Sequence, residues 1–187
     1  MRQHLRRSRR KLFSPNAWKV RLVFWLGAVL VGVVCAIFAE LAEHANHAFL
    51  WVAKQNPYLP LVLTPLALTG IAWLTINYFP GTQGSGIPQA IAALQMRSKG
   101  AVLSLKIAFG KVILTLLGLL AGASIGREGP SVHVGAAIMY TFGRYARFPP
   151  HYMERGLILA GGAAGVAAAF NTPLAGIMFA IEEMSRS

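Results

Sequence analysis

The sequence has 187 residues, of which 55% are hydrophobic and 13% are charged, and its mean hydropathy is +0.52. Soluble domains carry about 25% charged residues, so this composition excludes an ordinary soluble protein and predicts a membrane protein. The net charge of +12 does not predict a nucleic-acid partner, because eight of the 18 basic residues lie within the first 21 positions, just before an apolar stretch. We interpret this block as a cytoplasmic anchor under the positive-inside rule.

The first predicted membrane span covers residues 22–39, which carry no charge. This stretch is too long for the apolar core of a typical signal peptide. Acidic and imidazole side chains follow it, and we interpret them as a helix end in the headgroup region. A metal site is the alternative for these residues, although the HExxH pattern of zinc proteases is absent. They are Glu40, Glu43, His44 and His47.

Two further apolar segments, residues 61–79 and 103–125, are also expected to span the membrane. A break at residues 54–60 precedes the first, and Lys106 and Lys111 interrupt the second. Between them, turn residues lead into a short helix from Ile87 to residues 97–100. Three glycines at four-residue spacing in the last segment predict a face along which helices approach closely: Gly118, Gly122 and Gly126.

The last third of the chain predicts two more helical segments. Residues 130–145 are moderately apolar, and a polar loop over residues 147–155 follows them. Residues 156–181 are uncharged, but the triplet 171–173 (Asn-Thr-Pro) divides them, and Gly161 and Gly165 predict a second close-packing face. We therefore expect an all-α membrane bundle of unequal and broken helices.

Three positions place a proline where a helix would begin: residues 85–88, 128–130 and 171–173. Proline suits the first helical turn because the N–H groups of that turn have no partner in the helix. In a membrane, such free donors persist only inside protein or beside a water-filled path. Helix N-termini carry partial positive charge, so converging broken helices predict an anion site.

Glu128 stands at one of these helix starts, and this position raises two alternatives. Its carboxylate can occupy the anion site in competition with a transported ion, and protonation would then release the site. Alternatively, Glu128 simply caps the helix or pairs with Arg127.

Three motifs in this order resemble the CLC family of chloride channels and proton/chloride antiporters. They are GSGIP at residues 84–88, GREGP at 126–130 and AGGAAGVAAAFNTPLAGIMFAIEEM at 160–184. The resemblance extends from about residue 20 to the end. It implies a polytopic helical bundle with broken and re-entrant helices, corresponding to the first inverted-topology repeat. Residues 1–19 would be a basic cytoplasmic segment and residues 20–187 the N-terminal half of the transmembrane domain.

The resemblance also implies roles for individual residues. Ser85 would donate its hydroxyl to chloride, Glu128 would be the gating and external proton glutamate, and Glu183 would be the internal proton glutamate. The alternative for Glu183 is a solvated acid beside Glu182. The remaining implied residues form the anion site (Gly86, Ile87 and Pro88) and the gate loop (Gly126, Arg127, Gly129 and Pro130).

The chain departs from the family pattern in two ways. The second-half motif GxFxP and its late tyrosine do not occur, since Tyr140, Tyr145 and Tyr152 stand in other contexts. The resemblance therefore covers about half a transporter: a truncated product, an excised domain or a half that needs a partner chain. Gln89 and Ile91 stand where many family members carry acids.

We expect a chloride transporter, with proton-coupled antiport favoured because Glu128 and Glu183 are both present. The alternatives are a passive chloride channel, a non-transporting or partner-dependent membrane component, and a metalloenzyme built on the cluster at residues 40–47. We expect no enzyme activity and no cofactor. The expected partners are chloride, protons, the lipid bilayer, and a second copy or a complementary half. The expected location is a bacterial inner (plasma) membrane, spanned several times, with a cytoplasmic N-terminus.

Overall fold

The computed structural model describes residues 15–96, 98–146 and 152–184, and within these ranges the chain is helical without strands. Three helices are long and apolar enough to cross a membrane, at Trp18–Gln55, Leu59–Asn77 and Lys99–Leu120. The predicted all-α membrane fold is confirmed. The predicted basic segment, residues 1–19, lies largely outside the described residues.

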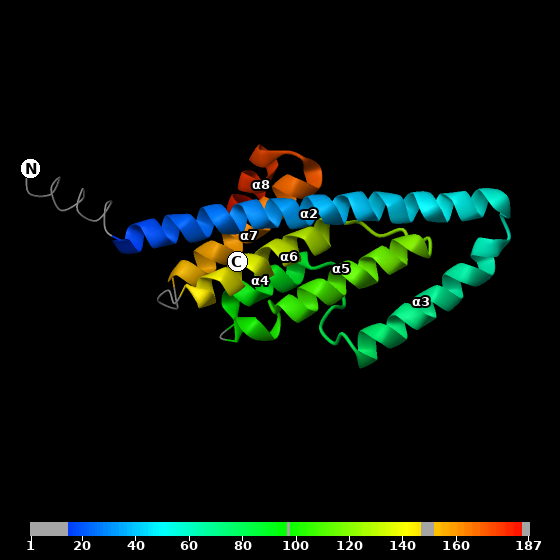
Figure 1. The fold of residues 1–187 in the computed structure, drawn as a ribbon. Coiled ribbons are helices and arrows are strands. Elements are labelled where there is room, and N and C mark those ends of the chain that lie inside the picture. The colour runs from blue at the N-terminus through cyan, green and yellow to red at the C-terminus, as the bar shows by residue number, and fades with distance from the viewer. Residues whose placement is uncertain (1–14, 97, 147–151, 185–187) are drawn as a thin grey trace, which may run out of the picture.

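The described elements follow the predicted order, with short helices between long ones (Figure 1). Prolines at the starts of α3, α4 and α8 mark the predicted breaks. The elements are α2 (Pro15–Gln55), α3 (Leu59–Asn77), α4 (Ile87–Gln95), η1 (Lys99–Ala101), α5 (Leu105–Leu120), α6 (Glu128–Tyr145), α7 (Tyr152–Phe170), α8 (Pro173–Phe179) and η2 (Ala180–Met184).

The core lies around α6, which is buried along most of its length. α7 packs along α6, and α2 and α5 also contact it, whereas α3 has no buried residue. In Figure 1, α2 runs along the whole bundle and α3 turns back from its far end, away from the core. The start of α2 and the end of α6 lie at the same end of the molecule.

Glycines allow α6 and α7 to touch through their backbones. A Cβ atom at Gly161 would lie 2.7 Å from the carbonyl carbon of Gly135, and one at Gly165 would lie 2.8 Å from that of Ser131. Real side chains do not approach so closely, so only glycine fits at these positions. The predicted close-packing face at Gly161 and Gly165 is confirmed.

Three predicted helix boundaries were wrong, each at polar or glycine-rich positions. α2 continues through residues 40–47 to Gln55, because no glycine or proline interrupts this stretch and neighbouring turns support each other. His44 Nδ1 donates to the Glu40 carbonyl oxygen at 2.8 Å, and His47 Nε2 lies 3.8 Å from Glu43 Oε1. These residues are therefore not a helix end.

The segment predicted over residues 103–125 ends earlier than expected. α5 ends at Leu120, and Gly122 adopts a φ of +83° that terminates the helix. Gly122 and Gly126 therefore lie outside α5, and the predicted three-glycine helix face was wrong. The predicted loop 147–155 is also shorter than expected, since α7 begins at Tyr152. Its residues 147–151 lie outside the described residues.

The α6–α7 contact predicts a difference between two glycines of the same helix. Gly161→Ala should lower the free energy of unfolding by about 1–3 kcal/mol, because the new methyl group meets rigid backbone. Gly156→Ala is the matched control, since a Cβ there meets nothing within 4 Å. Thermal unfolding in detergent would measure both, and equal stability of the two variants would contradict this account of the packing.

Candidate functional site

Two of the three broken helix starts meet in the structure. Ser85 and Gly86 lead into α4, and Glu128 opens α6. A Cβ atom at Gly86 would lie 2.5 Å from the Gly129 carbonyl oxygen, and one at Gly129 would clash with the Ser85 hydroxyl and carbonyl. The two starts therefore touch through their backbones, with no side chain between them.

The third start lies elsewhere. α8 begins at Pro173 after Asn171, which has a φ of +54°, and these residues are exposed. α8 packs on α7, and its start does not line the cavity beside Ser85 and Glu128. In the structure, the helix starts at GSGIP and GREGP are in contact, whereas the helix start at residues 171–173 lies apart from them.

Ser85 and Glu128 line one cavity of about 560 Å³. Glu128 also lines a second cavity of about 640 Å³, together with Glu43, Asn46 and Arg127. Its half-buried carboxylate folds back over Gly126, where a Cβ would clash with Glu128 Oε2. Glu128 therefore stands between two cavities. The first cavity is lined by Gly84, Ser85, Ile87, Thr115, Ile125, Gly126, Glu128, Gly129 and Pro130.

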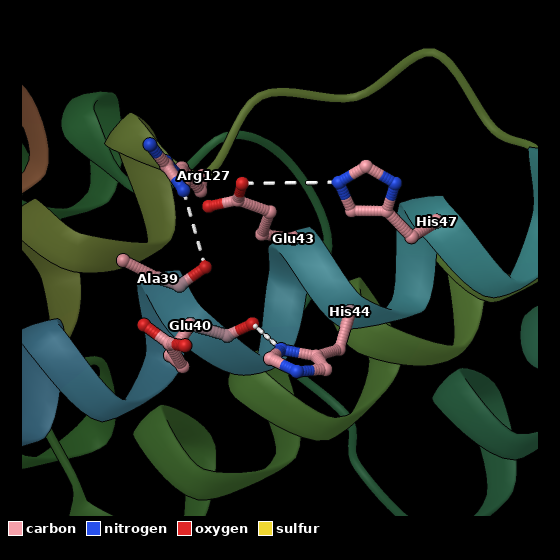
Figure 2. A network of polar contacts seen from close by, with 6 residues as sticks. All are labelled: Ala39, Glu40, Glu43, His44, His47 and Arg127. Atoms are coloured by element: carbon pink, nitrogen blue, oxygen red, sulfur yellow. Dashed lines mark hydrogen bonds and ion pairs between the residues drawn. The ribbon is translucent and has the colours of Figure 1, made fainter.

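Arg127 connects the start of α6 to α2. Its Nη1 donates to the Ala39 carbonyl oxygen at 3.1 Å. Figure 2 shows this bond, with the Glu43 carboxylate lying between Arg127 and His47. Among the contacts of the described residues, no ion pair joins Arg127 to Glu128. The arginine therefore holds the helix start in place without neutralising the neighbouring glutamate.

Lys111 forms a buried tether, although from the sequence alone it is only an interruption of an apolar segment. Its Nζ donates to the carbonyl oxygens of Thr82 and Gly84, both at 2.9 Å, and its side chain is 2% exposed. These bonds hold the loop that leads to Ser85. The available signal was the lysine itself, since ionisable residues within apolar membrane segments are functional candidates.

Gln89 lies in the first turn of α4, and its side chain caps the start of that helix. Its Oε1 accepts from the Gly86 N–H at 2.8 Å, while its Nε2 donates to the Gln83 carbonyl at 2.6 Å. A carboxylate at this position would accept the first bond but could not donate the second. The departure from the family pattern at Gln89 therefore has a structural use.

His133 is a second buried polar group, and no sequence motif singled it out. The side chain is fully buried one turn after Pro130, and its Nε2 lies 3.1 Å from the Val102 carbonyl oxygen. Its Cβ lies against Gly86, and Nδ1 has no hydrogen-bond partner among the described residues. His133 thus connects α6, the start of α4 and the residues before α5.

Glu183 does not lie at the cavity. It is exposed on η2, the segment whose Met184 is buried against Gly162 of α7. The structure therefore places Ser85, Gly86, Ile87, Pro88 and the residues 126–130 together, and places Glu183 apart from them.

A metal site receives no support. Within the described ranges, no group of three or more histidine, cysteine, aspartate or glutamate side chains is arranged to hold a metal ion. The cluster at residues 40–47 lies along one stretch of α2, with His44 bonded to the backbone.

Comparison with known proteins places these features in a family. A family model described as "Voltage gated chloride channel" matches residues 67–187. "Chloride channel protein CLC-c" of Arabidopsis thaliana is 37% identical over 95% of this chain, and "H(+)/Cl(-) exchange transporter ClcA" of Vibrio cholerae is 34% identical over 84%. "Chloride channel protein 1" of Rattus norvegicus is 32% identical over 86%. The matched regions cover 26%, 36% and 18% of these relatives.

The Lys111 tether predicts a local effect of its removal. Lys111→Met should speed amide hydrogen exchange over residues 82–90 by about tenfold, because the Thr82 and Gly84 carbonyls lose a charged donor. Lys106→Met, an exposed lysine on the same helix, should leave the exchange of this loop unchanged. Hydrogen-exchange mass spectrometry would measure both, and equal exchange in the two variants would show that Lys111 does not hold the loop.

Proposed function

Because the chain belongs to the voltage-gated chloride channel family, we propose that it forms part of a pathway that carries chloride across a membrane. The observation that supports this most directly is the cavity at which the starts of α4 and α6 meet, with Ser85 and Glu128 in its wall. Helix starts present unpaired N–H donors and partial positive charge to such a cavity. These partial charges attract an anion without a full charge that would hold it too tightly to leave.

In this proposal, the anion site consists of the Ser85 hydroxyl and the backbone of residues 86–88. Ser85 is exposed to the cavity, and Lys111 and Gln89 hold the backbone on either side of it. The gate loop consists of Gly126, Arg127, Gly129 and Pro130.

Glu128 is the proposed gate because it lines both cavities. An ionised carboxylate at this point repels an anion and competes for the same N–H donors. A protonated carboxyl group has no such charge, so in this proposal protonation lets an anion pass Glu128 between the two cavities.

Proton-coupled antiport is our first candidate for the mechanism, with Glu128 as the external and Glu183 as the internal proton group. The relative from Vibrio cholerae is named as an exchange transporter, while those from Arabidopsis thaliana and Rattus norvegicus are named as channels. A passive chloride channel is the second candidate, favoured by the position of Glu183 away from the cavity.

The protein is an integral membrane protein with three helices of spanning length. We propose that it lies in a bacterial inner membrane with its basic N-terminus in the cytoplasm, following the positive-inside rule. The matched regions cover well under half of the relatives, so we propose that further protein contributes to the pathway. This would be a second copy, in a homodimer of the full-length protein, or a complementary second half.

The gate proposal predicts the effect of Glu128→Gln on the full-length protein in liposomes. Chloride efflux should continue while coupled proton uptake falls to background, because glutamine cannot bind and release a proton at this point. A chloride electrode and a pH electrode would measure both fluxes. Glu40→Gln is the control, since this exposed glutamate on α2 lies outside both cavities. Unchanged proton coupling in Glu128→Gln would overturn the gate assignment.

The internal proton role predicts a difference between adjacent acids. Glu183→Gln should abolish proton coupling and leave chloride movement, whereas Glu182→Gln should retain both. The same flux measurement tests this pair. Proton flux that survives in both Glu128→Gln and Glu183→Gln would defeat the antiporter candidate, and intact chloride flux would then support the channel.

A further inference from the structure

A separate pocket of about 420 Å³ lies where the start of α5 meets the end of α6. Ser104 and Leu105 contribute one wall, and Tyr140 and Arg144 contribute another. None of its lining residues lines the cavity at Ser85 and Glu128. The pocket is therefore distinct from the proposed chloride pathway.

Two hydrogen-bond donors, the Tyr140 hydroxyl and the Arg144 guanidinium, face Gly100 in this pocket. A Cβ atom at Gly100 would lie 3.7 Å from the Tyr140 hydroxyl oxygen and 3.7 Å from Arg144 Nη1. Because Gly100 has no side chain, the space in front of the two donors stays open. A guanidinium beside a hydroxyl is a typical arrangement for binding a phosphate oxygen.

Neither donor is used within the described part of the chain. Tyr140 is 8% exposed, yet its hydroxyl forms no hydrogen bond with any described residue, and Arg144 likewise has no described partner. Among the described residues, the sealed polar side-chain atom without a partner is His133 Nδ1 and not the Tyr140 hydroxyl, so this hydroxyl is open to the pocket that Tyr140 lines. It can therefore bind a ligand that enters the pocket.

The electrostatics of the pocket favour an anion. α5 begins here, and Ser104 Oγ accepts only from the Ile107 N–H, at 3.2 Å. The N–H groups of Leu105 and Lys106 have no intrahelical acceptor. The nearby Glu154 is already paired with Lys99 at 3.3 Å, so it does not cancel the charge of Arg144.

The mouth of the pocket favours a lipid over a soluble phosphate. Leu105 is 49% exposed and Tyr145 is 85% exposed, so apolar surface lies directly beside the donors. Figure 1 places the end of α6 at the same end of the bundle as the start of α2, which carries Lys19 and Arg21. By the positive-inside rule this is the cytoplasmic side, where anionic lipids collect.

We propose that this pocket binds the phosphate of an anionic phospholipid headgroup. Arg144 and the Tyr140 hydroxyl bind the phosphate oxygens together with the first N–H groups of α5. Leu105 and Tyr145 contact the start of the acyl chains.

The test is native mass spectrometry of the full-length protein, titrated with phosphatidylglycerol and, separately, with phosphatidylcholine. Wild-type protein should retain phosphatidylglycerol preferentially. Arg144→Gln and Tyr140→Phe should each weaken that binding by about tenfold, because each loses a bond to a charged group. Tyr140→Phe changes only a hydroxyl. Lys54→Gln is the matched control, since it removes an exposed positive charge at the other end of α2.

Three results would overturn the proposal. The first is equal retention of the two lipids by wild-type protein. The second is phosphatidylglycerol binding by both pocket variants at the strength of wild type. The third is displacement of phosphatidylglycerol by inorganic phosphate at equal concentration, which would assign the pocket to a soluble anion. The measurement involves no ion flux, so its outcome is independent of the proposed chloride transport.

Discussion

The contact between the backbones of Gly86 and Gly129 is the constraint on which the rest of the site depends. It brings two helix starts together with no side chain between them, and it sets Ser85 and Glu128 in the wall of one cavity. Free N–H groups at membrane depth require such a protected setting, because lipid offers them no hydrogen bonds. The same contact therefore shelters the broken helix starts and assembles the site that we propose for the anion.

Two positively charged side chains, Lys111 and Arg127, hold this arrangement in place, and both donate hydrogen bonds to backbone carbonyl groups. Lys111 reaches from α5 to the loop before Ser85, and Arg127 reaches to Ala39 on α2. A carbonyl dipole satisfies the hydrogen bonds of a cation but does not cancel its charge as a carboxylate would. Within the described residues, neither of these side chains forms an ion pair with a carboxylate.

Features with a local cause could be predicted from the sequence, and features that depend on distant partners could not. Uncharged runs and prolines located most helices, and the glycines of α7 predicted its contact with α6. The continuation of α2 was missed because polar residues such as Glu43 do not by themselves end a helix. The role of Lys111 was missed because its partners lie nearly thirty residues away. Likewise, the residues at 171–173 predict a helix start but not that this start lies apart from the other two.

The absence of side chains at the Gly86–Gly129 contact also determines how the cavity can be altered. The two helix starts meet there through main-chain atoms, which no substitution can trim. An enlarged residue at either glycine would separate the helix starts and not simply narrow the opening. Under the proposed chloride function, discrimination between anions of different radius would therefore be tuned through side chains that border the cavity, such as the buried Thr115 and the exposed Ile125.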